Sequence, residues 1–214
     1  MKKFKWLGKA LIMLGLLASA GWVQGAGQTM TAAQKPSLGT NGPEGRFQPD
    51  VQTLSFEAGA VGGVKILGST QSHNLALASL TYGRMLGPVW GEDHWYRGNW
   101  ELRLELFGGS EFSPSQDYIV GLTPHLRYDF ATGTRWIPFL DAGAGLTATG
   151  IGNPDLSSTF EFNIQGGAGL HCLVGKNWAV TAEVRYLHIS DAEMTSPNNG
   201  VNGVMGMVGV TRFF

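Results

Sequence analysis

The stretch that decides the fold is 99–107, which reads NWELRLELF. Its apolar positions alternate with charged ones: Trp100, Leu102, Leu104 and Leu106 against Glu101, Arg103 and Glu105. Because side chains alternate between the two faces of a β-strand, one face of this strand is apolar and the other is charged. In a membrane β-barrel the apolar face meets lipid and the polar face points into the lumen. The stretch therefore predicts a strand of such a barrel.

The same alternation recurs after residue 50, most clearly in 176–187, KNWAVTAEVRYL. No amphipathic helical segment follows residue 50 to cover the apolar faces, and no later stretch approaches the roughly 18 apolar residues of a spanning helix. Eight segments of this kind are expected, at 52–61, 74–86, 97–108, 118–130, 135–149, 160–173, 177–190 and 200–214. The sequence therefore predicts an all-β fold, an eight-stranded antiparallel transmembrane β-barrel in the outer membrane of a Gram-negative bacterium.

The lengths of the connections orient this barrel. The longer connections are predicted to be external, at 62–73, 108–117, 150–159 and 191–199, and the short ones periplasmic, at 131–134 and 174–177. The connection 87–96 is long although it lies on the periplasmic side. An interfacial aromatic girdle is expected near the periplasmic ends, formed by Trp90, Trp95, Tyr96, Trp136 and Trp178.

The composition excludes several classes of function. The 214 residues have a formal net charge of -1, which predicts no nucleic-acid partner. Cys172 is the single cysteine, so an internal disulfide and a multi-thiolate metal site are excluded. No metal or other cofactor is predicted, because four histidines lack a second ligand at metal spacing: His73, His94, His125 and His171. The charged strand residues are expected to fill the lumen as a paired polar plug: Glu101, Arg103, Glu105, Glu183 and Arg185.

The N-terminal segment, residues 1–26, predicts a cleaved signal peptide. It has four lysines, then an apolar run, then the small residues Ala18-Ser19-Ala20. A retained signal anchor is the alternative interpretation. Residues 27–50 lack periodicity and are expected to form a flexible leader, which leaves 51–214 for the barrel.

Two polar residues break the pattern in the segment 177–190. The parity that directs Trp178 and Val184 toward lipid also directs His188 and Ser190 there. A hairpin through 191–199 brings Asn202 roughly opposite His188, again on the exterior. One interpretation is a polar rim at the headgroup boundary, where polarity costs only about 0–1 kcal/mol. The other is a nucleophile, a base and an orienting group for that base.

A family resemblance bears on this choice. Residues 185–210, RYLHISDAEMTSPNNGVNGVMGMVGV, together with PHLRYDF at 124–130 and WIPFLDAGAGL at 136–146, resemble the lipid A 3-O-deacylase (PagL) family of outer-membrane barrels. The resemblance implies that Ser190 is the nucleophile and His188 the general base of an esterase, with lipid A or lipopolysaccharide as its partner. It implies removal of the 3-O-linked hydroxyacyl chain, and it is compatible with a homodimer.

Three positions depart from the family's pattern. Asn202 stands where the family has an acidic orienting residue, and Asn holds an imidazole without stabilising its charge. Asp191 replaces an Asn near the oxyanion hole, and Glu193 replaces a small Gly. Asp191 or Glu193 is therefore a candidate either for the oxyanion region or for orienting His188. The alternative function is a catalytically inactive structural or adhesive barrel.

Overall fold

The computed structural model describes residues 43–91 and 93–214. The predicted signal peptide, residues 1–26, and the first part of the predicted leader lie outside the described residues. No helix within the described residues is long and apolar enough to cross a membrane.

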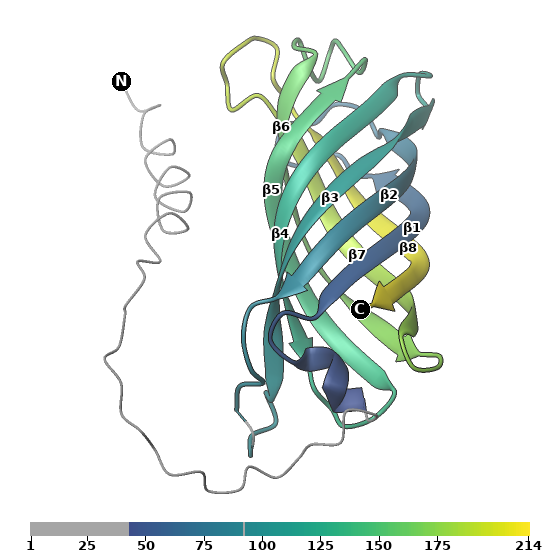
Figure 1. Ribbon diagram of the computed structural model, residues 1–214. Coiled ribbons are helices and arrows are strands. Elements are labelled where there is room, and N and C mark those ends of the chain that lie inside the picture. The colour runs from purple at the N-terminus through teal and green to yellow at the C-terminus, as the bar shows by residue number, and fades with distance from the viewer. Residues whose placement is uncertain (1–42, 92) are drawn as a thin grey trace, which may run out of the picture. The chain divides into compact units, whose positions relative to one another are not determined.

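Eight antiparallel strands close into a barrel in sequence order, with β1 paired to β8 (Figure 1). The strands are β1 Gln52–Gly63, β2 Asn74–Met85, β3 Gly98–Ser113, β4 Tyr118–Phe130, β5 Trp136–Thr149, β6 Phe160–Leu173, β7 Trp178–Ser190 and β8 Val201–Phe213. The loops 64–73, 114–117, 150–159 and 191–200 lie at one end, here called the outer end, and the other end is the periplasmic end. The predicted eight-stranded antiparallel barrel is confirmed.

The predicted end of the third strand is wrong. β3 continues to Ser113, so the predicted loop 108–117 shrinks to 114–117. Gly108 and Gly109 suggest a turn, but the alternation continues past them, with Glu111 buried and Phe112 exposed. Gly109 fits the close packing of the wall, since a Cβ there would lie 1.9 Å from the Ala76 carbonyl oxygen.

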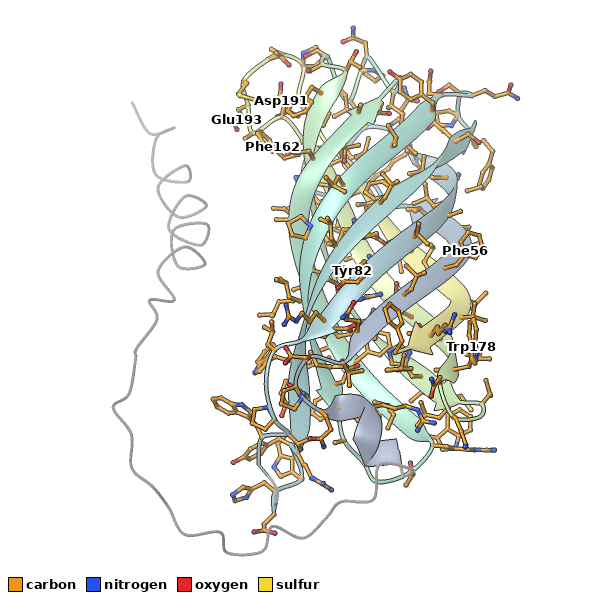
Figure 2. The ribbon with its side chains drawn as sticks, in the orientation of Figure 1. Phe56, Tyr82, Phe162, Trp178, Asp191 and Glu193 are labelled. Carbon is orange, nitrogen blue, oxygen red and sulfur yellow. The ribbon has the colours of Figure 1, made fainter. Side chains whose placement is uncertain are left out.

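The exterior of the barrel is apolar. Large hydrophobic side chains project from every strand, among them Phe56, Tyr82 and Trp178 (Figure 2). The five aromatic residues expected near the periplasmic ends are all exposed. A second set of exposed aromatic residues lies at the outer ends of the strands: Phe112, Tyr118, Phe160 and Phe162. Two such belts are the pattern that a membrane-spanning barrel requires.

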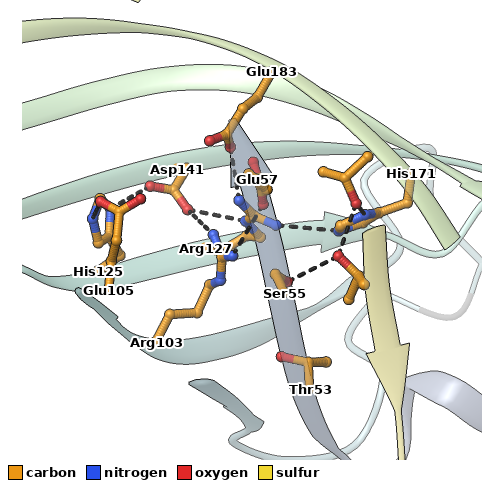
Figure 3. A network of polar contacts seen from close by, with 12 residues as sticks. Thr53, Ser55, Glu57, Arg103, Glu105, His125, Arg127, Asp141, His171 and Glu183 are labelled. Atoms are coloured by element: carbon orange, nitrogen blue, oxygen red, sulfur yellow. Dashed lines mark hydrogen bonds and ion pairs between the residues drawn. The ribbon is translucent and has the colours of Figure 1, made fainter. Parts of the chain in front are cut away.

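The middle of the lumen holds a network of ion pairs (Figure 3). Arg127 donates to Asp141 and Glu183, both at 2.9 Å, and its guanidinium lies 3.6 Å from the centre of the Phe139 ring. Arg185 donates to both carboxylate oxygens of Glu105, at 2.8 and 3.0 Å. Clusters of buried apolar side chains pack above and below this network. The predicted polar plug therefore fills the middle of the lumen, between the two apolar clusters.

Part of the predicted leader is packed against the barrel. Pro43–Phe47 form a 3-10 helix, η1, at the periplasmic end (Figure 1). The Phe47 ring is buried and meets Phe213 edge-on, with 6.5 Å between ring centroids. The Asn99 side chain donates to the Phe47 carbonyl at 2.8 Å. Residues 43–50 thus differ from the predicted flexible leader, because Phe47 packs into the apolar cluster around Phe213. The local sequence pattern of the leader does not indicate this long-range contact.

Candidate active site

The polar residues of the exterior lie on two paired strands. In the β7–β8 ladder His188 is directly opposite Asn202. Trp178, Val180 and Val184 are exposed on the lipid face of β7, and the same parity leads to half-buried His188 and Ser190. The alternation of the strand therefore places these two side chains on the outside of the barrel, near its outer end.

His188 joins the other two side chains by hydrogen bonds. Its Nδ1 lies 2.7 Å from Asn202 Oδ1, and its Nε2 lies 3.0 Å from Ser190 Oγ. An amide oxygen only accepts hydrogen bonds, so Nδ1 carries the proton and Nε2 is free to accept one. The Ser190 hydroxyl then donates to Nε2. This is the arrangement that a serine nucleophile and its general base need.

Asn202 is buried, with only 1% of its surface exposed, and hydrogen bonds fix both ends of its side-chain amide. Its Oδ1 also accepts a hydrogen bond from the Tyr186 hydroxyl at 2.5 Å, and its Nδ2 donates to the Ile66 carbonyl at 2.9 Å. Because a carbonyl oxygen only accepts hydrogen bonds, the amide atom that faces Ile66 must be the nitrogen, and this fixes which amide atom of Asn202 faces His188. Sequence reasoning missed both partners: Tyr186 shares the parity of His188, whereas nothing in the sequence marks Ile66.

Asp191 and Glu193 lie elsewhere, in the loop 191–200 (Figure 2). The Asp191 carboxylate is buried and accepts hydrogen bonds from the backbone amides of Met194 and Thr195, at 3.1 and 2.8 Å, and from the Thr195 hydroxyl. The Glu193 side chain is exposed. Within the described residues, no hydrogen bond or ion pair joins either carboxylate to His188. The structure therefore brings together three of the five predicted site residues.

Asn198 is a polar neighbour of the nucleophile that sequence reasoning also missed. Its Oδ1 accepts a hydrogen bond at 3.4 Å from the backbone N–H of Asp191, the residue that follows Ser190 in the chain. Its position in an irregular loop gives no periodic signal that would have placed it there.

As for metal ions, no group of three His, Cys, Asp or Glu side chains among the residues described is arranged to hold one.

Comparison with known proteins identifies the family of this site. The model of the family "Lipid A 3-O-deacylase (PagL)" matches residues 77–211, which include β7, β8 as far as Thr211 and the whole of the His188–Ser190–Asn202 group. The chain belongs to this family. It is 28% identical over 133 residues to the lipid A deacylase PagL of Pseudomonas aeruginosa. This match covers 58% of this chain and 73% of the relative.

Solved structures agree on the fold of this PagL family member. The outer membrane enzyme PagL is 20% identical, with a TM-score of 0.50, and the match covers 74% of this chain and 97% of that one. Neisserial surface protein A (NspA) is 16% identical, with a TM-score of 0.56 and coverage of 77% and 97%. The family and these barrel neighbours place the protein in the outer membrane of a Gram-negative envelope.

Proposed function

We propose that this PagL family member is an esterase that removes the 3-O-linked hydroxyacyl chain from lipid A, with Ser190 as nucleophile and His188 as general base. The observation that carries this proposal is the continuous hydrogen-bond chain from Asn202 through His188 to Ser190, with 2.7 and 3.0 Å at its two links. A polar rim without catalytic purpose needs no such order, whereas a nucleophile needs a base and the base needs an orienting group.

The reaction proceeds in two halves. The Ser190 oxygen attacks the ester carbonyl carbon while His188 Nε2 takes the hydroxyl proton. The tetrahedral intermediate collapses, the sugar alcohol leaves with the proton from His188, and the acyl chain remains esterified to Ser190. Water then attacks this ester while His188 Nε2 takes a proton from it, the proton passes to the Ser190 oxygen as that oxygen leaves, and a 3-hydroxy fatty acid is released. Asn202 keeps His188 in the tautomer that accepts the serine proton.

The exterior below the site fits an acyl chain. Phe162 is opposite Ser190 and Ile164 is opposite His188 in the β6–β7 ladder, while Val204 is opposite Tyr186 in β8. Phe162, Ile164 and Val204 are exposed apolar side chains. A lipid in the outer leaflet therefore reaches Ser190 by lateral diffusion, with its chains already along this surface and its ester near the rim.

The oxyanion is assigned to the backbone N–H of Asp191, the residue directly after the nucleophile. At 3.4 Å, the bond from the Asp191 N–H to Asn198 is longer than an ordinary hydrogen bond, so a developing oxyanion can replace it. The Asp191 carboxylate does not oppose this, because the Met194 and Thr195 donors hold it within the loop. The proposal assigns no catalytic role to Glu193. The homodimer remains a prediction.

Mass spectrometry of lipid A tests the proposal. Lipid A from Gram-negative cells that express the wild-type chain should lose the mass of one 3-hydroxyacyl group, and lipid A from cells with Ser190→Ala should not. Heat-modifiable migration of both proteins on gels shows that equal amounts of folded barrel are compared. Unchanged lipid A beside abundant folded wild type would support the structural or adhesive barrel instead.

A further inference from the structure

A cluster of polar side chains ties the outer loops together beside the site. Asp155, in the loop 150–159, is fully buried, and its carboxylate has four donors. Oδ1 accepts from the Thr70 amide and hydroxyl, both at 2.7 Å, and Oδ2 accepts from the Gln71 amide at 2.8 Å. The fourth contact is from His73 Nε2 at 2.9 Å. Both lone pairs of each oxygen are thus occupied.

The loop 64–73 connects this carboxylate to the orienting residue. At one end of the loop Thr70, Gln71 and His73 meet Asp155. At the other end the Ile66 carbonyl accepts from Asn202 Nδ2 at 2.9 Å, and the Val64 amide donates to the Asn202 carbonyl at 2.8 Å. The position of the Ile66 carbonyl therefore depends on how Asp155 holds the loop.

The same residue also holds the loop 191–200. The Asp155 backbone carbonyl accepts from the amides of Asn199 and Gly200, at 2.8 and 3.1 Å. Gly200 packs against the base: a Cβ there would lie 3.1 Å from His188 Cε1. Its φ of +78° is one that glycine adopts readily, so the loop turns here without strain. Asp155 thus fixes both loop segments that border the His188–Asn202 pair.

We infer that Asp155 is a positioning residue for the deacylation site, its carboxylate acting through the Ile66 carbonyl to keep Asn202, and with it His188, in the productive orientation. This inference rests on the proposed function. Asp155 touches none of the three reacting side chains, so its effect passes through Asn202. His73 is supported from behind by Glu111 of β3, at 2.5 Å from Nδ1, which completes the cluster.

Asp155→Asn is the variant that tests this role. The amide keeps the size of the side chain, but its NH2 group must face a backbone N–H of Thr70 or Gln71, which is itself a donor. Because the effect passes through Asn202, kcat on micellar 3-O-acylated lipid A should fall as far as in Asn202→Ala, by about 2- to 13-fold. KM should stay within about twofold, because the acyl surface is untouched. The rate at which a serine-reactive phosphonate labels Ser190 should fall with kcat.

A double mutant separates positioning from a general structural effect. In an Asn202→Ala background, Asp155→Asn should lower kcat by less than about twofold, because the shared pathway is already lost. Equal falls in both backgrounds, or an unchanged kcat in the single variant, would overturn the inference. The control is Asp50→Asn, which removes a carboxylate at the periplasmic end, where Asp50 pairs with exposed Arg84.

Two further results keep the test decisive. If Asp155→Asn does not yield a heat-modifiable barrel, Thr70→Val removes one bond to the same carboxylate and is compared in the same two backgrounds. Full activity of Ser190→Ala would overturn the proposed function and this role with it. An inactive Ser190→Ala beside a fully active Asp155→Asn would overturn the positioning role alone.

Discussion

Replacing Asn202 by alanine or by aspartate separates the two tasks of an orienting residue, which are to hold the imidazole and to stabilise its charge. Asn202→Ala removes the 2.7 Å bond to His188 Nδ1. A neutral hydrogen bond contributes about 0.5–1.5 kcal/mol, which corresponds to a rate about 2- to 13-fold lower. The loss is modest because Asn supplies orientation without charge.

Asn202→Asp should act in the opposite direction on kcat. The aspartate has the same size, and its charge strengthens the bond to His188 when the imidazole carries the serine proton. A hydrogen bond to a charged group contributes about 1.5–3 kcal/mol, so the gain over the neutral bond corresponds to about tenfold in kcat. This gain arises because the charge on His188 develops only in the transition state.

The same substitution should weaken the folded loop. Asn202 Nδ2 donates to the Ile66 carbonyl at 2.9 Å, and in the aspartate two oxygens face each other there. An acceptor left without its donor costs about 1–3 kcal/mol, but equally in the ground state and the transition state. Asn202→Asp should therefore be faster and less resistant to unfolding than the wild type.

The assay is deacylation of micellar lipid A across pH 6–9, with rates compared on the plateau and normalised to heat-modifiable protein. Urea unfolding followed by tryptophan fluorescence gives the stability. The reasoning is refuted if Asn202→Asp is no faster than the wild type on the plateau. It is also refuted if Asn202→Ala is as inactive as Ser190→Ala, because Asn202 would then do more than orient the base.

Three predictions concern the scaffold. Arg127→Met leaves two buried lumen carboxylates without this partner and should lower the free energy of unfolding by about 3–5 kcal/mol, whereas Arg84→Met at the exposed pair should leave urea unfolding unchanged. Gly59→Ala places a Cβ 1.9 Å from a carbonyl oxygen and should reduce the yield of heat-modifiable barrel, whereas Gly206→Ala, with open space around its Cβ, should not. Burial alone would raise the pKa of Asp155, but its hydrogen bonds hold the pKa below the usual value. The contribution of these hydrogen bonds to stability is therefore present above about pH 3.9, and it is lost as the pH falls through the pKa of the folded state. Hydrogen exchange should therefore show the amides that donate to Asp155 protected at pH 5, and loss of protection between pH 7 and 5 would contradict this.

The parts of the molecule that follow a repeat could be predicted from the sequence. The alternation of apolar and polar residues predicted the strands. The same alternation on the last two strands, joined by a hairpin, predicted that His188 lies opposite Asn202, and the register of β7 and β8 confirms it. The end of β3 was missed because Gly108 and Gly109 resemble a turn, although in a tightly packed wall the absence of a Cβ is what lets neighbouring strands approach.

The contacts that orient the site could not be predicted in this way. Ile66 contributes a backbone carbonyl, which any residue type has, and it meets Asn202 across 136 positions of the chain. Asp155 is a single carboxylate in an irregular loop, where no period relates it to Thr70 or Gly200. Such contacts depend on how three loops fold over one another, and only the three-dimensional structure contains that information.

The hydrogen bonds of the site also explain how polar groups are accommodated on a surface that faces lipid. An unsatisfied hydroxyl or amide in an apolar environment is costly, yet here each polar side chain finds its partner within the protein. Tyr186 donates to Asn202, Asn202 accepts from His188, and His188 accepts from Ser190. The chain that satisfies these groups at the membrane boundary is the same chain that directs the His188 lone pair at the Ser190 proton. In the proposed mechanism, stability and activity at this position are therefore coupled: a variant that breaks the link between Asn202 and His188 leaves polar groups unsatisfied, and it should lower the stability of the outer end as well as the rate of the reaction.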